Sequence, residues 1–364
     1  MNTGLLGGIT FVLVFAGMIL VHEIGHFAAS RWMKIEVEEF GFGIPPRIIT
    51  LFTWKGTKFS LNWLPLGGFV RIKGEDDPAV TGGMASAKPW RRLVVLLAGV
   101  SMNLLTAVLA YSILFNQVGI PDENTTIISG VEEGAPAAQA GIEPGDIILL
   151  SNGHHITTTE ELIALTYKNL GQPVALVLAR DGQVLEVTIT PRTEWPEGSG
   201  PMGVALTNPF VPVKSWFATL PFSFEVTGRD IVTLFSLPGK LIAGTASPEE
   251  GQIGGPRTIW NFFQAAVASD VHSRQPDSGE TQPTYYTLMV IIGLSISLGT
   301  LNLLPIPALD GGRVLFLLPE FLFRRAIPAK YQAAINGTAF ILLIVLLAFF
   351  YIKDFINPIV INLP

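Results

Sequence analysis

Four predominantly apolar stretches constrain this chain more than any other feature of its sequence. They cover residues 5–32, 93–115, 284–304 and 333–352. Each reaches the roughly 20 residues that one crossing of a lipid bilayer needs. The composition agrees, because 49% of the 364 residues are hydrophobic and 14% are charged, against about 25% charged residues in a soluble protein. The sequence therefore predicts an α-helical polytopic membrane protein with about four transmembrane helices.

The first stretch carries three titratable residues in five positions, His22, Glu23 and His26, with no charge before them. On a helix, positions i and i+4 share a face, so the two imidazoles can hold one metal ion. The carboxylate of Glu23 can then take a proton from a water that the metal activates. Ionisable groups in a membrane span are costly, and a functional site is their default interpretation. The alternative is a chance motif in a buried helix whose histidines are hydrogen-bonded.

The third stretch ends in a second unusual segment, where Pro305 and Pro307 precede Asp310. Two prolines break a helix and free backbone groups, which a membrane tolerates where the segment is buried in protein or lines a wet cavity. Together with His22 and His26, Asp310 would give three protein ligands and an open fourth position, the pattern of catalytic zinc. The alternative for Asp310 is a helix-end residue that meets water.

Basic residues predict the orientation of the chain. They are concentrated between the first and second stretches and between the third and fourth, so both connections are expected in the cytoplasm. The acid-rich segment between the second and third stretches is then outside, and the metal site lies near the cytoplasmic side. The net charge of −6 argues against nucleic acid as a partner. The absence of cysteine excludes a thiolate metal site.

The first cytoplasmic connection has strand character. Residues 59–63 and 69–72 flank a segment that contains Gly67 and Gly68, which predicts a β-hairpin with a glycine turn. One interpretation is a plain surface hairpin. The other is an edge strand near the metal onto which an extended substrate can pair, with Gly67 and Gly68 as substrate-binding residues.

The outer segment starts as a small α/β domain. Strands are expected at 126–131 and 145–153, a helix at 159–167, and a hairpin at 174–190. The order and the glycine–proline-rich string at 134–147 resemble a PDZ domain of the bacterial protease type. That resemblance implies a groove for an extended peptide or a carboxyl terminus. His154 and His155 are adjacent, so they are expected to be exposed turn residues and not metal ligands.

The predicted domains follow from these assignments. The first membrane half covers residues 1–115, with the metal motif, the hairpin segment and the second span. The PDZ-like domain covers 118–195, and an amphipathic or linker region covers 196–283. Within that region, a pair of amphipathic helices is expected at 209–255 and a loose loop at 269–283. The second membrane half covers 284–364.

The two motifs, H-E-x-G-H at His22 and N-x-x-P-x-P-x-x-D-G from Asn302 to Asp310, resemble those of the site-2 protease family. The likeness is to its bacterial regulator-cleaving branch, and it covers nearly the whole chain. Similar strings occur at residues 66–70, at Ala98 and Gly99 with Asn103, and at 254–256. The resemblance implies one Zn²⁺ per chain on His22, His26 and Asp310, with Glu23 activating water and Asn302 helping to hold the substrate.

The same resemblance implies a function. A member of this family is an intramembrane zinc endopeptidase that hydrolyses peptide bonds within transmembrane segments of single-span membrane proteins. In regulated intramembrane proteolysis, such substrates include anti-sigma factors and signal-peptide remnants. The expected location is the bacterial inner membrane, with the PDZ-like domain on the outer face. Two other classes stay open: a non-catalytic membrane scaffold that recruits proteins through the PDZ-like domain, and a metal transporter that uses the same residues.

Overall fold

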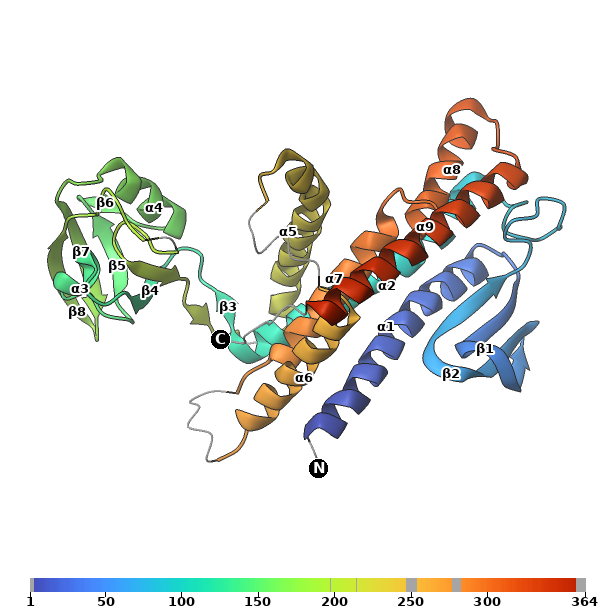
Figure 1. Ribbon diagram of the computed structural model, residues 1–364, viewed down its shortest axis with the longest axis horizontal. Helices are drawn as coiled ribbons and strands as arrows, with labels where there is room; N and C mark the ends of the chain where they lie inside the picture. The colour runs from blue at the N-terminus through green and yellow to red at the C-terminus, as the bar shows by residue number, and fades with distance from the viewer. Residues whose placement is uncertain (1–2, 197, 214, 247–253, 277–282, 358–364) are drawn as a thin grey trace. The chain divides into compact units, whose positions relative to one another are not determined.

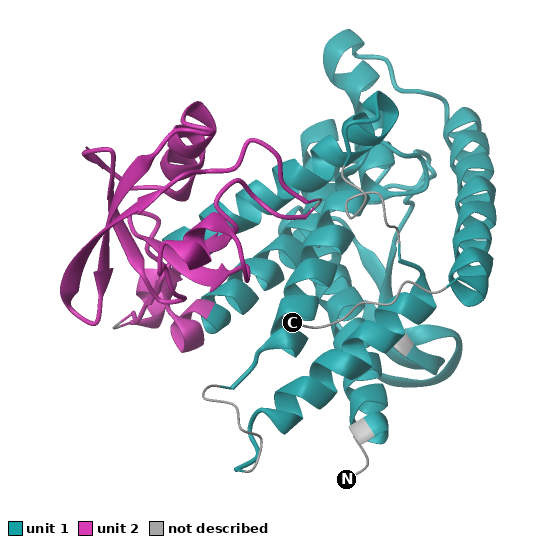
Figure 2. Cartoon of the chain, turned by 60° about the vertical axis from the view of Figure 1, so that its left-hand side comes forward, with its two compact units in different colours: residues 1–114, 220–364 teal, residues 115–219 magenta. Residues whose placement is uncertain are grey.

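A computed structural model describes residues 3–196, 198–213, 215–246, 254–276 and 283–357. The chain divides into two compact units, which are coloured separately in Figure 2. Unit 1 consists of residues 1–114 and 220–364, and unit 2 consists of residues 115–219. Unit 1 holds most of the helices and the predicted metal motifs, and unit 2 holds most of the β-strands.

Unit 1 consists mainly of helices, several of them long (Figure 1). Its helices are α1 (Thr3–Trp32), α2 (Pro89–Val118, whose last turn extends into unit 2), α5 (Trp216–Ala243, whose first turn belongs to unit 2), α6 (Pro256–His272), α7 (Tyr286–Leu303), α8 (Asp310–Phe323) and α9 (Ala329–Ile356). Among the described residues, α1, α2, α7 and α9 are long and apolar enough to cross a membrane. These helices coincide with the four predicted stretches, although α9 continues past residue 352 and so includes Asp354.

Unit 1 has a hairpin in this segment, but it differs from the predicted one, whose two strands at 59–63 and 69–72 both lie within strand β2 (Thr57–Ile72). Strand β1 (Val37–Trp54) and β2 meet at Lys55 and Gly56, which both have positive φ. The segment with Gly67 and Gly68 lies within β2 and not at a turn. The start of β1 pairs with both ends of β2, so that Phe40 faces Val70 and Phe59. The curled sheet explains the error, because Gly67 permits a bend inside a strand and local sequence cannot distinguish that bend from a turn.

One apolar core joins several elements of this unit. Buried side chains from the end of α1 and the residues after it, from the end of β2 and the segment after it, and from α2 and α8 pack together: Ala29, Met33, Ile35, Ile72, Met84, Val95, Leu96 and Leu317. An ion pair of 2.9 Å between Arg92 and Glu320 links α2 to α8 beside this core. The packing brings the end of α1 and the start of α8 together, and these two positions carry the predicted metal motifs.

The predicted break in the third span is confirmed. Helix α7 ends at Leu303 and α8 begins at Asp310, with Pro305 and Pro307 between them. A Cβ on Gly311 would lie 2.3 Å from the carbonyl oxygens of both Leu303 and Leu304. Glycine is therefore needed here because the start of α8 lies directly on the carbonyls that the broken helix leaves free.

The region after unit 2 differs from its prediction. A single helix, α5, replaces the expected pair of amphipathic helices, since Pro221 and Pro238 both lie within it without ending it. Residues 247–253 lie outside the described residues. The predicted loop at 269–283 begins later than expected, because α6 continues to His272. Residues 277–282 of that loop also lie outside the described part of the chain.

Unit 2 contains a six-stranded sheet in the order β8-β7-β5-β4-β9, with β6 beside β5. The strands of this sheet are β4 (Thr126–Val131), β5 (Ile147–Ser151), β6 (His154–His155), β7 (Val174–Arg180), β8 (Gln183–Ile189) and β9 (Val204–Thr207). Unit 2 also contains two helices, α3 (Pro136–Gln139) and α4 (Thr159–Lys168). Two short strands, β3 (Ile120–Pro121) and β10 (Phe210–Val211), form a separate pair. The predicted strands, helix and hairpin are confirmed. Helix α4 starts with a capping box between Thr158 and Glu161.

The predicted boundary of the PDZ-like domain at residue 195 is too early. Strand β9 pairs with β4, and its Val204 and Leu206 pack against the core of unit 2. This strand is only four residues long, so its alternation was too short to be recognised in sequence. His154 and His155 are both exposed on β6, as expected for surface residues.

Candidate metal centre

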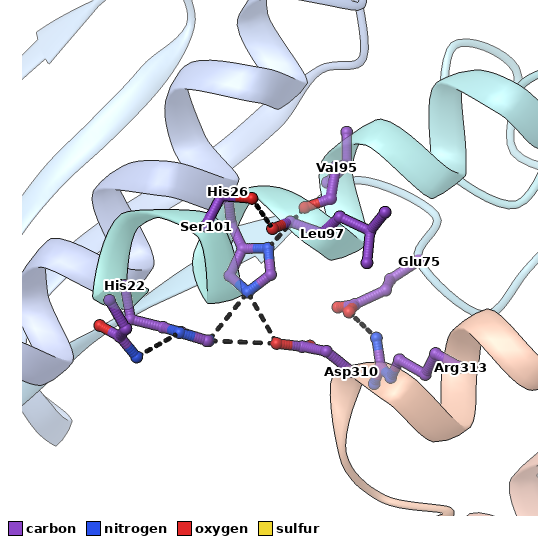
Figure 3. Close-up of polar contacts among 9 residues, drawn as sticks. His22, His26, Glu75, Val95, Leu97, Ser101, Asp310 and Arg313 are labelled. Atoms are coloured by element: carbon purple, nitrogen blue, oxygen red, sulfur yellow. Dashed lines mark hydrogen bonds and ion pairs between the residues drawn. The ribbon is translucent and has the colours of Figure 1, made fainter. Parts of the chain in front are cut away.

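The three predicted metal ligands come together in unit 1. The Nε2 atom of His22 lies 3.2 Å from Oδ2 of Asp310, and Nε2 of His26 lies 3.3 Å from the same oxygen. The two Nε2 atoms are 3.1 Å apart. Figure 3 shows both rings of α1 pointing at the carboxylate from α8. His22 and His26 are each 8% exposed, so this triangle of polar atoms is nearly removed from solvent.

One oxygen of the triangle lacks a hydrogen bond. Nδ1 of His26 lies 2.8 Å from the carbonyl oxygen of Val95, which can only accept a hydrogen bond. His26 therefore carries a proton on Nδ1, and the neutral ring presents a lone pair at Nε2. Oδ2 of Asp310 is a buried oxygen with no hydrogen-bond donor. Two electron-rich atoms thus face each other at 3.3 Å, an arrangement that a cation between them would stabilise.

The spacing suits zinc. A tetrahedral zinc ion with bonds of about 2.0–2.1 Å keeps neighbouring ligand atoms about 3.3 Å apart. The three distances of 3.1, 3.2 and 3.3 Å match that separation. Two imidazole nitrogens and one carboxylate oxygen are also the donor set of many catalytic zinc sites. Among the described residues, this is the group of His, Asp and Glu side chains whose geometry could hold a metal ion.

Glycines make the space in which the triangle forms. A Cβ on Gly25 would lie 2.5 Å from the carbonyl oxygen of Ala98, so α1 and α2 are in close contact there. A Cβ on Gly99 would lie 2.4 Å from Nε2 of His26 and 2.8 Å from Nε2 of His22. Any larger residue at position 99 would occupy the place where the two imidazoles converge.

Helix α2 also contacts the outer side of each imidazole. The Val95 carbonyl accepts a hydrogen bond from His26, and the side chain of Asn103 approaches His22, with Nδ2 3.1 Å from Nδ1. Asn103 is 1% exposed. Outer contacts of this kind set the tautomer and the orientation of a metal-binding histidine.

Glu23 lies beside the triangle. It lines a cavity of about 220 Å³ together with the three candidate ligands, Phe69 and Val70. The backbone N–H of Val70 donates a hydrogen bond to the carboxylate of Glu23. The end of β2 is thereby fixed against the catalytic motif of α1.

An ion pair closes another side of the same cavity. Arg313 lies one turn after Asp310 on α8, and its guanidinium contacts the carboxylate of Glu75 in the segment after β2 (Figure 3). Both side chains are about one-third exposed, at 32% and 31%. This ion pair therefore forms part of the polar lining of the cavity.

The predicted substrate-binding residues are not among those that line this cavity. Gly67 and Gly68 pack on α1, where a Cβ would lie 2.6 Å from Ile19 and 3.2 Å from Leu20, respectively. Phe69 and Val70, the next residues of β2, are the ones that reach the cavity. Asn302 is half-buried near the end of α7. Its predicted role stays a prediction.

The comparisons with known proteins agree with this geometry. The model of peptidase family M50 matches residues 10–346. This chain belongs to peptidase family M50. The resemblance to site-2 proteases is therefore confirmed, and the M50 chain is a membrane protein and a zinc metalloprotease.

Two curated relatives of the M50 chain illustrate the match. A protein of Clostridium perfringens, whose name proposes a zinc metalloprotease, is 32% identical over 96% of this chain and 98% of its own length. Metalloprotease MmpA of Caulobacter vibrioides is 26% identical over 90% of this chain and 89% of its own. A solved PDZ domain from Listeria monocytogenes is 19% identical, covers 23% of this chain and 87% of that structure, and has a TM-score of 0.21.

Unit 2 has a cavity of its own, of about 880 Å³. It lies between α4 and β9, with Ile163 and Tyr167 on one side and residues 204–206 on the other. Strand β9 ends the sheet, so the edge that does not face β4 pairs with no described strand of that sheet. An open strand edge beside an apolar groove is the geometry that accepts an extended peptide as an added strand.

At the metal centre, the sequence indicates Asn103 only as part of a family-like string and assigns it no role, and it does not predict Val95 and Arg313. Asn103 gave a signal, because it is a strongly polar side chain in an apolar span, four residues after Gly99. Arg313 follows Asp310 by one helical turn, so its proximity was accessible once α8 was assigned as a helix. The Val95 carbonyl gave no signal, since every residue carries one.

Proposed function

We propose that this M50 peptidase is an intramembrane zinc endopeptidase that holds one zinc per chain and cleaves transmembrane segments of single-span membrane proteins. One observation carries the proposal. The buried Oδ2 of Asp310 has no hydrogen-bond donor and meets two imidazole nitrogens at the end of α1, a helix long and apolar enough to cross a membrane. A metal ion satisfies all three atoms, and the apolar helix makes the membrane the place of the reaction.

His22, His26 and Asp310 are the proposed zinc ligands, each through the atom that points into the triangle. Zinc, when bound, would supply a Lewis acid that lowers the pKa of a bound water from its bulk value to about 7. The chain's own contribution is to hold three ligands rigidly and to leave a fourth position open to the cavity. The Val95 carbonyl supports this role by keeping the lone pair of His26 on Nε2.

Glu23 is the proposed general base. It lines the cavity, follows His22 directly and accepts a hydrogen bond from Val70 that orients its carboxylate. We infer that it accepts a proton as the attacking water adds to the peptide carbonyl. It then returns that proton to the leaving nitrogen, so the C–N bond breaks and a carboxylate and an amine form. This exchange needs one carboxylate in proton-transfer range of both atoms.

The substrate must unwind locally, because the carbonyls of a transmembrane helix are bonded within the helix. The end of β2 is the proposed partner for the unwound strand. Phe69 and Val70 lie at the cavity, and the Gly67–Gly68 segment brings them close to α1. The side-chain amide of Asn302 both donates and accepts, so it is proposed to bond substrate backbone groups that have lost their partners.

The basic connections argue for a metal centre on the cytoplasmic side and for unit 2 on the outer side of a bacterial inner membrane. The groove between α4 and β9 is then available to an extended peptide or a carboxyl terminus outside the cell. We propose that unit 2 selects substrates that another protease has already shortened, as in regulated intramembrane proteolysis of anti-sigma factors or removal of signal-peptide remnants.

The test compares the wild type with Glu23→Gln and with Glu38→Gln, an equal change on the exposed face of β1. The purified proteins are analysed for zinc and for cleavage of a single-span model substrate in detergent. Glu23→Gln is expected to keep its zinc and to lose about 10²- to 10⁴-fold in cleavage rate, the usual contribution of a general base. Glu38→Gln is expected to match the wild type.

Wild-type cleavage by Glu23→Gln would reject the assignment of the base. A wild type that binds zinc, cuts no membrane substrate and still captures proteins through unit 2 would favour a scaffold. Zinc flux into proteoliposomes without cleavage would favour a transporter instead.

A further inference from the structure

The two candidate histidine ligands have different partners on their outer nitrogens. His26 donates to a backbone carbonyl, which leaves one tautomer possible. His22 instead contacts the side-chain amide of Asn103, at 3.1 Å between Nδ1 and Nδ2. A half-turn of that amide exchanges its nitrogen and oxygen, so Asn103 can offer either a donor or an acceptor to the ring.

Zinc at Nε2 of His22 requires the lone pair on that nitrogen. The ring proton must then sit on Nδ1, where it needs an acceptor in a site nearly closed to water. His22 is 8% exposed and Asn103 is 1% exposed. Among the described residues, the side chain hydrogen-bonded to Nδ1 is that of Asn103. With its oxygen turned toward the ring, the amide supplies the acceptor.

We propose that Asn103 is the positioning residue of the zinc site, which holds His22 through Nδ1 so that Nε2 faces His26 and Asp310. The inference rests on the proposed ligand set and adds a residue to it. Asn103 acts through His22 and touches neither zinc nor substrate.

The position of Asn103 on α2 fits this role better than a role in helix packing. It lies one turn after Gly99 on the same face of the helix, and Gly99 leaves the space that both imidazoles fill. A buried amide in an apolar span costs free energy unless it is bonded, and its partner here is the ring nitrogen of a candidate ligand. One helical face thus provides the room for the site and the support for His22.

The experiment measures zinc affinity in purified full-length protein by competition with a chromophoric chelator. Asn103→Leu keeps the approximate volume and removes the acceptor. Asn103→Asp keeps an acceptor oxygen. Thr106→Val is the matched control, because Thr106 lies nearly one turn further along α2 and bonds only its own helix at Met102.

Asn103→Leu is expected to weaken zinc binding about 10- to 100-fold, the usual cost of losing an outer partner of a metal ligand. Asn103→Asp is expected to bind zinc at least as tightly as the wild type. Thr106→Val is expected to bind as the wild type does. The melting temperature of each metal-free protein is recorded beside these values. If Asn103→Leu does not fold, Asn103→Ala takes its place with the same expected loss.

Zinc affinity in Asn103→Leu or Asn103→Ala equal to that of the wild type would overturn the inference. An equal loss in Asn103→Asp and Asn103→Leu would also overturn it, because an acceptor would then be irrelevant. A wild type without bound zinc would be a different failure, since it would reject the ligand set on which both proposals rest.

Discussion

Two aspartates of unit 1, Asp310 and Asp354, have opposite surroundings. At the metal centre, Asp310 faces two imidazole nitrogens, and its Oδ2 receives no hydrogen bond. At the junction of α9 with α6, Asp354 is 4% exposed and accepts hydrogen bonds from the backbone N–H groups of Arg257 and Thr258, at 2.7 and 3.0 Å. The hydroxyl of Thr258 also donates to Asp354.

The comparison distinguishes an aspartate that stabilises the fold, Asp354, from an aspartate whose environment favours a bound cation, Asp310. Asp354 caps the start of α6, where unpaired N–H groups and the helix dipole favour a negative charge. Nothing further is needed to stabilise it. Asp310 instead faces two imidazole nitrogens, which present lone pairs when the rings are neutral. A cation between these nitrogens and the carboxylate would stabilise all three groups. Burial of a charge in an apolar helix is therefore insufficient to identify function, and the sign of the neighbouring groups decides.

The largest difference between the two sites is expected when each aspartate is replaced by asparagine. Asp310→Asn removes the negative charge of one proposed zinc ligand. Binding free energies of about 10–16 kcal/mol for four-ligand zinc sites give about 3 kcal/mol per ligand, so the zinc dissociation constant should rise about 100- to 1,000-fold. Cleavage should fall with zinc content, which is measured by metal analysis after dialysis. Asp354→Asn should retain one zinc per chain.

Stoichiometric zinc in dialysed Asp310→Asn would mean that another residue completes the site. His272 and Glu75 are then the next residues to substitute.

A second prediction concerns the space for the ion. Gly99→Ala places a methyl group 2.4 Å from Nε2 of His26, so the ring must move away from the triangle. We expect zinc affinity to fall about 10- to 100-fold, as for other displaced metal ligands. Gly17→Ala is the control, because Gly17 lies on α1 with nothing within 4 Å of its Cβ position. An unchanged zinc affinity in Gly99→Ala would show that the two helices can separate without cost.

The sequence predicted the parts of the site that depend on local pattern. The i, i+4 histidines, the proline break and Asp310 all follow from spacing and from the cost of charge in lipid. It could not predict the curled β1–β2 sheet, because the pairing of Phe40 with both Phe59 and Val70 is decided by packing on α1. The same limit explains Asp354, which lies beyond the predicted end of the fourth span and whose partners are nearly 100 residues away.

The third prediction tests the structural acid. Asp354→Asn keeps one acceptor oxygen and replaces the other by a donor, which must face the N–H groups of α6. Hydrogen bonds to a charged group contribute about 1.5–3 kcal/mol each, so we expect a loss of about 2–3 kcal/mol of stability and a lower melting temperature. Lys353→Met, at the exposed neighbouring position, is the control for a change of charge. A melting temperature equal to the wild type would contradict the capping role.

The smallest effect is expected at Asp146 of unit 2, a buried aspartate that forms an ion pair with Arg180. Its side chain is 0% exposed, and Arg180 donates to both of its oxygens, at 2.6 and 2.8 Å. The hydrogen bonds from Arg180 hold the pKa of Asp146 below its usual value, although burial acts in the opposite direction. A carboxyl whose pKa is lower in the folded state adds stability above its unfolded pKa of about 3.9, and this stability is lost as the pH falls through the folded value.

Asp146→Asn should therefore cost about 1–3 kcal/mol at pH 7, and the cost should shrink steadily below about pH 4. The measurement is urea unfolding of the segment 115–219 at several pH values, since this unit has its own buried core and is expected to fold alone. Gln183→Glu, at an exposed position on β8, controls for charge without burial. If the difference between wild type and Asp146→Asn does not depend on pH, the carboxylate contributes by shape and not by charge. Asp146 would then differ from both Asp310 and Asp354, whose roles depend on a negative charge.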